Sequence, residues 1–144
     1  MSQDKLRLLF LCSGNSCRSQ MAEGWARALR GELIDAASAG LVPKGLDPHA
    51  VAVMREAGVD ISGQRSKHLE ELLDRKFDVV ITVCDNAYET CPVFPRPVRL
   101  VHRNFDDPPR LAASARSEEE ILNHYRRVRD ELREFVETLP DAVS

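Results

Sequence analysis

Residues 12–19 read Cys-Ser-Gly-Asn-Ser-Cys-Arg-Ser, a pattern that could let a thiol attack a bound oxyanion. Cys12 and Arg18 enclose five small or polar residues, directly after the apolar run Leu8–Leu11 and where a helix should begin. The backbone N–H groups and the positive dipole at a helix N-terminus attract anions. The planar guanidinium of Arg18 can hold two anion oxygens at once. The same positive field favours the thiolate of Cys12, the reactive form of cysteine.

A Cys-x5-Arg spacing by itself also fits a buried structural cysteine in a tight turn. The predicted strand before the loop, the Gly-Asn pair within it and the helix after it favour an anion site. Gly14 and Asn15 tolerate positive φ well, which a loop wrapped around an anion needs. Ser19 can donate a hydrogen bond to the Cys12 thiolate. The predicted oxyanion-binding residues are Ser13, Gly14, Asn15, Ser16, Cys17, Arg18 and Ser19.

Hydrophobic patterns along the chain predict alternating strands and helices. The predicted strands are Leu6–Leu11, Ile34–Ala39, Phe77–Val83 and Val98–Val101. The predicted helices are Arg18–Leu29, Asp47–Ala57, Ser66–Lys76 and Ser117–Pro140. This alternation predicts a single three-layer α/β domain over residues 1–144, with a four-stranded parallel sheet and helices on both faces.

Cys12 and Cys84 each follow an apolar strand of the predicted sheet. Ligands bind beyond the carboxyl ends of parallel strands. If the two strands are neighbours, both sulfurs face one crevice. Cys91 lies seven residues beyond Cys84 in a polar, proline-bounded segment. Three thiols in one neighbourhood predict a relay by thiol–disulfide exchange, although two incidental cysteines would give the same pattern.

The sequence Phe105-Asp-Asp-Pro-Pro109 predicts a rigid loop after the fourth strand. Proline biases the preceding residue, Asp107, towards an extended conformation. A carboxyl group held over an oxyanion could donate a proton to a leaving oxygen. A solvated turn is the alternative. The four histidines show no catalytic or metal-binding spacing.

The composition of the chain argues against nucleic acid and membranes as partners. The net charge of −3 gives no reason to expect nucleic acid or an anionic membrane surface. No apolar stretch approaches about 20 residues, and the N-terminus lacks a signal-peptide pattern, so we expect a cytoplasmic protein. A monomer is the default expectation for its oligomeric state. The cysteine spacings do not match structural zinc motifs, so we expect no metal site.

Several of these segments together resemble the thioredoxin-coupled arsenate reductases, which have the low-molecular-weight protein tyrosine phosphatase fold. The resemblance spans nearly the whole chain. It rests on residues 12–25, on Ser38-Ala-Gly40, on Cys84 and Cys91 with Pro92, and on Phe105-Asp-Asp-Pro108. The first motif fits both reductases and phosphatases. The Cys-x6-Cys pair favours the reductases, because the phosphatases do not need it.

The resemblance implies a role for each catalytic residue. Cys12 would attack arsenate, held by Arg18 and the loop amides, and Asp107 would protonate the leaving oxygen. Cys84 would then attack Cys12, releasing arsenite, and Cys91 would move the disulfide outward to Cys84–Cys91 for reduction by thioredoxin. Phosphate or sulfate would act as analogues of arsenate. Cys17 has no step, and we expect it to serve packing.

Some arsenate reductases of this kind bind potassium through four residues. Three of them match Asn15, Glu23 and Ser38, and the fourth is an Asp at the position of Lys67. Because Lys67 replaces this Asp, its ammonium could reach Glu23 and supply the missing charge. We therefore expect no potassium requirement and no other cofactor.

Two other functions fit parts of the pattern. A low-molecular-weight protein tyrosine phosphatase would use Cys12, Arg18 and Asp107 but neither Cys84 nor Cys91. Those phosphatases usually carry an aromatic residue after the Asp-Pro pair, whereas Pro109 and Arg110 follow here. A thiol module that binds metal or arsenite would need three clustered cysteines but not Asp107.

Overall fold

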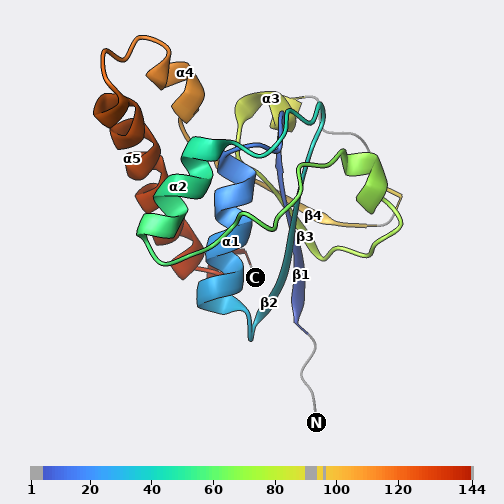
Figure 1. Ribbon diagram of the computed structural model, residues 1–144. Coiled ribbons are helices and arrows are strands. Elements are labelled where there is room, and N and C mark those ends of the chain that lie inside the picture. The colour runs from blue at the N-terminus through green and yellow to red at the C-terminus, as the bar shows by residue number, and fades with distance from the viewer. Residues whose placement is uncertain (1–4, 90–93, 96, 144) are drawn as a thin grey trace.

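The computed structural model describes residues 5–89, 94–95 and 97–143, which form a parallel sheet with the strand order β2-β1-β3-β4 (Figure 1). The strands are β1 (Leu6–Cys12), β2 (Ile34–Gly40), β3 (Val79–Thr82) and β4 (Arg99–His102). In the register, Cys12 pairs with Gly40 of β2 and Leu11 with Thr82 of β3. The predicted four-stranded parallel sheet is confirmed. Its order makes the strands before Cys12 and Cys84 neighbours.

Three helices, α1 (Arg18–Arg30), α2 (Pro48–Glu56) and α5 (Glu118–Glu137), cover one face of the sheet (Figure 1). The 3₁₀ turn η1 (Leu69–Leu72) lies on the other side, and η2 (Asp141–Val143) follows α5. The short helices α3 (Asp85–Glu89) and α4 (Pro108–Ala112) follow β3 and β4. The carboxyl ends of the strands therefore lead into α1, α3 and α4, which surround one end of the sheet.

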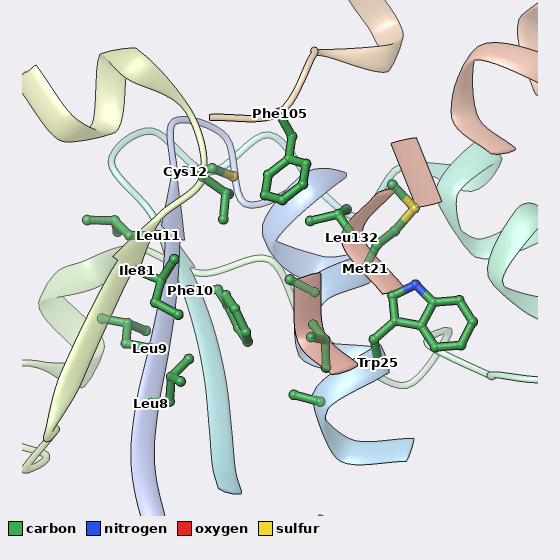
Figure 2. Close-up of a cluster of buried hydrophobic side chains, with 14 of the residues drawn as sticks. Leu8, Leu9, Phe10, Leu11, Cys12, Met21, Trp25, Ile81, Phe105 and Leu132 are labelled. Carbon is green, nitrogen blue, oxygen red and sulfur yellow. The ribbon is translucent and has the colours of Figure 1, made fainter. Parts of the chain in front are cut away.

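The hydrophobic core lies between the sheet and these helices. The side chains of Leu8–Leu11 in β1 are fully buried, as expected for a central strand covered on both faces. In Figure 2 the Phe10 ring lies on the side of β1 that faces Met21 and Trp25 of α1 and Leu132 of α5, whereas Leu9 and Leu11 lie on the opposite side. Burying each such large apolar side chain contributes about 1.5–3 kcal/mol. This packing fixes the strand end at which Cys12 lies.

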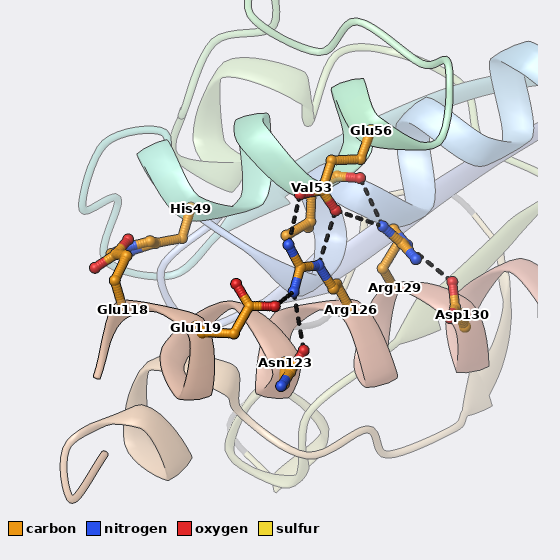
Figure 3. Close-up of polar contacts among 9 residues, drawn as sticks. All are labelled: His49, Val53, Glu56, Glu118, Glu119, Asn123, Arg126, Arg129 and Asp130. Atoms are coloured by element: carbon orange, nitrogen blue, oxygen red, sulfur yellow. Dashed lines mark hydrogen bonds and ion pairs between the residues drawn. The ribbon is translucent and has the colours of Figure 1, made fainter. Parts of the chain in front are cut away.

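Two arginines of α5 form hydrogen bonds with α2 and hold the two helices together (Figure 3). The guanidinium of Arg126 donates to both carboxylate oxygens of Glu56 at 2.9 and 2.8 Å. Arg129 donates to the Val53 carbonyl at 2.9 Å. The Arg126 hydrogen bond holds the pKa of Glu56 below its usual range. At the other end of α2, the Asp47 carboxylate accepts from the His49 N–H and caps the helix.

The segment 66–76 contradicts the predicted helix. Only the 3₁₀ turn η1 forms, with Leu69 and Leu72 buried three residues apart, as the eclipsed spacing of a 3₁₀ turn allows. The preceding residues run extended beside β2, where His68 bridges Gly40 and the Lys67 carbonyl accepts from the Gly40 N–H at 2.9 Å. The Lys67 carbonyl is therefore bonded to β2 and does not accept the hydrogen bond that it would accept within a longer helix.

Two short helices also replace predicted irregular segments. Helix α4 starts at Pro108 with Asp107 at its N-cap position. The Asp-Pro pair that indicated the start of α2 recurs there, so the sequence contained the pattern that would have predicted α4. Helix α3 occupies the segment after Cys84, for which no helical periodicity was visible.

Candidate active site

The predicted oxyanion loop connects the end of β1 to the first turn of α1. Cys12 is the last residue of the strand and Arg18 the first of the helix, so the loop amides lie at the positive end of a 13-residue helix. Asn15 adopts φ +45°, which confirms the expected positive φ at this residue; Gly14 does not share it. Leu41 and Val42 donate backbone hydrogen bonds to the Ser13 carbonyl at 2.9 and 2.8 Å. The loop is therefore anchored to the end of β2.

A chain of hydrogen bonds directs a hydroxyl hydrogen at the Cys12 sulfur. The Asn15 Oδ1 accepts from the Lys67 N–H at 2.9 Å, which fixes the orientation of the amide and leaves Nδ2 to donate to Ser19 Oγ at 2.8 Å. Ser19 Oγ lies 2.9 Å from Cys12 Sγ. Because Ser19 already accepts from Asn15, its own hydrogen is available for the sulfur. The predicted Ser19–Cys12 contact is confirmed.

The Arg18 side chain links this loop to the segment that follows β4. Its Nη1 donates to the Phe105 carbonyl at 2.8 Å, and its Nη2 lies 3.7 Å from Asp107 Oδ1. The side chain is only 13% exposed, whereas Asp107 is 39% exposed. The Phe105 side chain belongs to the same buried cluster as Cys12 (Figure 2). The Arg18 guanidinium and the Asp107 carboxyl group, which were predicted to act on the same oxyanion, therefore lie close together at the site.

A pocket of about 220 Å³ opens above the loop. Its lining includes Cys12, Ser13, Gly14, Ser16, Cys17, Arg18, Lys44, Asp107 and Pro109. The buried Asn15 and Ser19 lie beneath this lining as supports of Cys12. Lys44, whose aliphatic chain packs beside Gly14, was not among the predicted site residues. The Phe105 carbonyl that accepts from Arg18 could not be predicted either, because any residue type can provide a backbone acceptor.

Cys84 lies beside the loop that begins at Cys12, as expected if the strands before the two cysteines are neighbours. It is buried, and its Sγ lies 3.5 Å from Ser13 Oγ and 3.4 Å from the Ala87 N–H, which donates to it. The thiols of Cys12, Cys17 and Cys84 are free. A larger cleft is lined by Ser13, Arg18, Cys84 and Asp107 among others. Cys91 and Pro92 lie outside the described residues.

Cys17 has a different environment from Cys12. Its side chain is buried, and this burial, reinforced by the nearby Asp47 carboxylate, raises the pKa of its thiol well above the usual value. The thiol therefore stays neutral and inert, which fits the packing role expected for this residue.

Glu23 and Ser38, two positions that the resemblance associates with potassium, lie together beneath the loop. Ser38 Oγ donates to Glu23 Oε1 at 2.7 Å, and Arg27 forms an ion pair with the same carboxylate. The Lys67 ammonium donates to the Arg65 carbonyl at 3.1 Å. Burial lowers the pKa of Lys67, and the charge of Glu23 partly offsets this effect. Arg27, rather than Lys67, thus provides the ion pair to Glu23.

The described part of the chain contains no group of three or more His, Cys, Asp or Glu side chains arranged to hold a metal ion. Nor does it contain a helix with the length and apolar character needed to cross a membrane.

Replacing Gly40 with alanine should displace the loop. A Cβ at this position would lie 2.8 Å from the Asn15 nitrogen and 2.9 Å from the Ser13 carbonyl oxygen, both backbone atoms that cannot rotate away. We expect Gly40→Ala to lower the free energy of unfolding by about 1–3 kcal/mol. Affinity for inorganic phosphate should fall about 10-fold, since the donors lose alignment. Urea denaturation and calorimetric titration measure the two effects.

Gly63→Ala is the matched control, because no atom lies within 4 Å of its added Cβ. We expect it to change stability by less than about 0.5 kcal/mol. If the two variants had the same free energy of unfolding and the same affinity for phosphate, the tight contact at Gly40 would be contradicted.

Known proteins share this sequence and fold. The family model described as low molecular weight phosphotyrosine protein phosphatase matches residues 7–144. The arsenate reductase of Bacillus subtilis (strain 168) is 45% identical over 135 residues, covering 91% of this chain and 95% of that protein. The arsenate reductase of Halalkalibacterium halodurans is 43% identical over 138 residues, covering 96% and 97%.

Solved structures give the same result. An arsenate reductase in the phosphate-binding state superposes with a TM-score of 0.73 at 35% identity, covering 96% of this chain and 99% of that one. The low molecular weight protein tyrosine phosphatase from T. tengcongensis has a TM-score of 0.73 at 26% identity, with the same coverage. The similarity to arsenate reductases and the predicted phosphatase fold are thus confirmed, and the chain belongs to the low molecular weight phosphotyrosine protein phosphatase family.

Proposed function

We propose that this protein reduces arsenate to arsenite through a relay of Cys12, Cys84 and Cys91, and that thioredoxin restores the thiols. The observation that carries the proposal is the position of Cys84. Its buried sulfur lies at the end of the strand next to β1 and 3.5 Å from the hydroxyl of Ser13, the residue after Cys12. A hydrolase needs no second thiol there. The arsenate reductases that share more than 40% of the sequence support the same substrate.

In the first step the loop binds arsenate and Cys12 attacks it. Arg18 and the amides of residues 13–18 hold the oxygens, and the hydrogen bond from Ser19 favours the Cys12 thiolate. The sulfur forms a bond to arsenic while an As–O bond breaks. Asp107, which lies 3.7 Å from the Arg18 guanidinium, donates the proton that lets the oxygen leave as water. Phosphate and sulfate, which have similar shape and charge, would compete for this site.

In the second step the Cys84 thiolate attacks Cys12 Sγ in the adduct. The S–As electron pair leaves with arsenic, which is thereby reduced from As(V) to As(III) and released as arsenite. The two sulfurs are oxidised and form the Cys12–Cys84 disulfide. Electrons and atoms balance without a cofactor, because the two thiols supply both electrons.

In the third step the Cys91 thiolate attacks Cys84 Sγ. The Cys84–Cys91 disulfide forms, and Cys12 is released as a thiolate for the next arsenate. The dithiol of thioredoxin then reduces this second disulfide. Such a relay requires a reducing compartment, so we place the protein in the cytoplasm, and nothing in the relay requires more than a monomer.

Arsenate-dependent oxidation of NADPH, coupled through thioredoxin and its reductase, tests the proposal. We expect repeated turnover with the unmodified protein and loss of turnover after Cys91→Ser. Accumulated Cys12–Cys84 disulfide in that variant, identified by peptide mass spectrometry, would place the block at the third step. A protein that consumes no NADPH with arsenate would contradict arsenate reduction by this route.

Phosphate ester hydrolysis is a second candidate function, favoured by the family match and by the Cys12–Arg18–Asp107 arrangement. Water would hydrolyse a Cys12 phospho-adduct without any use of Cys84. The residues after Asp107 are Pro108, Pro109 and Arg110, so no aromatic side chain directly follows to grip a phosphotyrosine ring. We expect slow hydrolysis of p-nitrophenyl phosphate as a side activity of the same loop.

We also propose that catalysis needs no potassium. The buried Glu23 carboxylate already pairs with Arg27, and the Lys67 charge lies near it. Turnover and melting temperature should therefore be equal in potassium and sodium chloride at equal ionic strength. A marked increase in either quantity with potassium alone would contradict this prediction.

A further inference from the structure

We propose that His102 and Asp85 form a positioning pair that holds Cys84 in place for its attack on Cys12. The pair lies outside the oxyanion pocket, at the junction of β3, β4 and α3. His102 Nε2 lies 2.7 Å from Asp85 Oδ1, and His102 Nδ1 lies 2.8 Å from Thr82 Oγ1. This inference rests on the proposed arsenate reduction, because only that reaction uses Cys84.

The His102 ring is fixed at both nitrogens. Thr82 is fully buried and is the register partner of His102 on the neighbouring strand, so its hydroxyl holds the ring against the sheet. The other nitrogen then faces Asp85, whose side chain is 68% exposed and has little packing to restrain it. The imidazole therefore connects a rigid strand end to a residue that would otherwise be poorly restrained.

Asp85 is both the neighbour of Cys84 and the first residue of α3. A helix of five residues is not stable on its own and depends on tertiary contacts for its conformation. The first turn of α3 also supplies the Ala87 N–H, which donates to Cys84 Sγ at 3.4 Å. By holding Asp85, His102 thus holds the turn that points this N–H at the sulfur and keeps the sulfur beside Ser13.

The contacts of Cys12 come from other parts of the chain. Its sulfur interacts with Ser19 in α1, and the loop is supported by Asn15 and by the end of β2. Breaking the His102–Asp85 hydrogen bond should therefore slow the second step and leave the first nearly unchanged. A residue that merely stabilised the fold would affect both steps together.

The test measures formation of the Cys12–Cys84 disulfide in a Cys91→Ser background, where the relay stops at that bond. One arm uses diamide as the oxidant and needs no arsenate. The other measures the single burst of arsenite after arsenate is added. We expect His102→Leu and Asp85→Ala each to slow disulfide formation about 10-fold, as misplacement of a reacting group does. The double variant should be no slower than either single variant.

His102→Gln should restore the rate to within about 2-fold, because its amide can still donate towards Asp85. Glu118→Ala is the matched control, since it breaks a second exposed histidine–carboxylate pair, His49–Glu118 at 2.9 Å, far along the chain from Cys84. It should leave the disulfide rate unchanged. Melting temperature and p-nitrophenyl phosphate hydrolysis should stay near the values of the unmodified protein in all variants.

Disulfide formation within 2-fold of the unmodified rate in His102→Leu and Asp85→Ala would overturn the positioning role. Parallel losses of phosphate ester hydrolysis and disulfide formation would overturn it as well, since the pair would then support the whole site. The Cys91→Ser protein could also release no arsenite while diamide still forms the disulfide at the rates expected for each variant. That outcome would count against arsenate reduction only, and the positioning of Cys84 would stand.

Discussion

Replacing Cys84 with serine should abolish arsenate reduction while p-nitrophenyl phosphate hydrolysis continues. A hydroxyl at this position is neither ionised near neutral pH nor able to form a disulfide, so the Cys12–arsenic adduct has no reductant. The adduct can only return to arsenate by hydrolysis. We expect thioredoxin-coupled turnover to fall at least about 100-fold, as is usual when a covalent catalyst is removed.

Phosphate ester hydrolysis is the internal control for this variant. The loop, Arg18 and Asp107 remain, and the hydrogen bond between Cys84 Sγ and Ser13 Oγ is weak because sulfur is a poor donor and acceptor, so its removal should disturb the loop little. Cys84→Ala should behave like Cys84→Ser, which separates loss of the thiol from effects of the new hydroxyl. Continued multiple turnover with arsenate in either variant would show that Cys84 is not the second thiol.

Replacing Arg18 with lysine should remove both activities. The guanidinium donates to the Phe105 carbonyl with one nitrogen while another faces Asp107 and the pocket. A lysine ammonium keeps the charge but cannot reproduce two parallel donors in one plane. We expect kcat to fall about 100- to 1,000-fold, the usual cost of losing a donor that stabilises a developing oxyanion.

Steady-state kinetics with p-nitrophenyl phosphate and competition by inorganic phosphate measure the effect on the first step. Arg55→Lys, at an exposed position on α2, is the matched control and should retain normal rates. If Arg18→Lys kept more than a tenth of the unmodified kcat, positive charge alone would suffice and the planar fork would have no special role.

Local features of this protein follow from short patterns in its sequence. The run Leu8–Leu11 predicted a buried strand and the periodicity after Arg18 predicted a helix, and both form, so the loop with its Cys and Arg could be located between them. These patterns act over a few residues, which is the range in which hydrophobic spacing and capping are specific. The same short range explains the error at 66–76, where backbone contacts with Gly40 outweighed helical spacing.

The contacts between residues far apart in the chain depend on the tertiary fold. The hydrogen bond from Arg18 to Phe105 joins residues 87 positions apart, and Gly40 limits the loop only because β2 pairs with β1. Strand alternation predicts a parallel sheet but leaves the order of its strands open, because crossover connections of similar length allow several orders. The order β2-β1-β3-β4 brings Cys84 beside Ser13 of the loop and His102 beside Thr82. The sequence therefore predicted a nucleophile and its anion loop, whereas the sheet order placed a second thiol, that of Cys84, beside that loop.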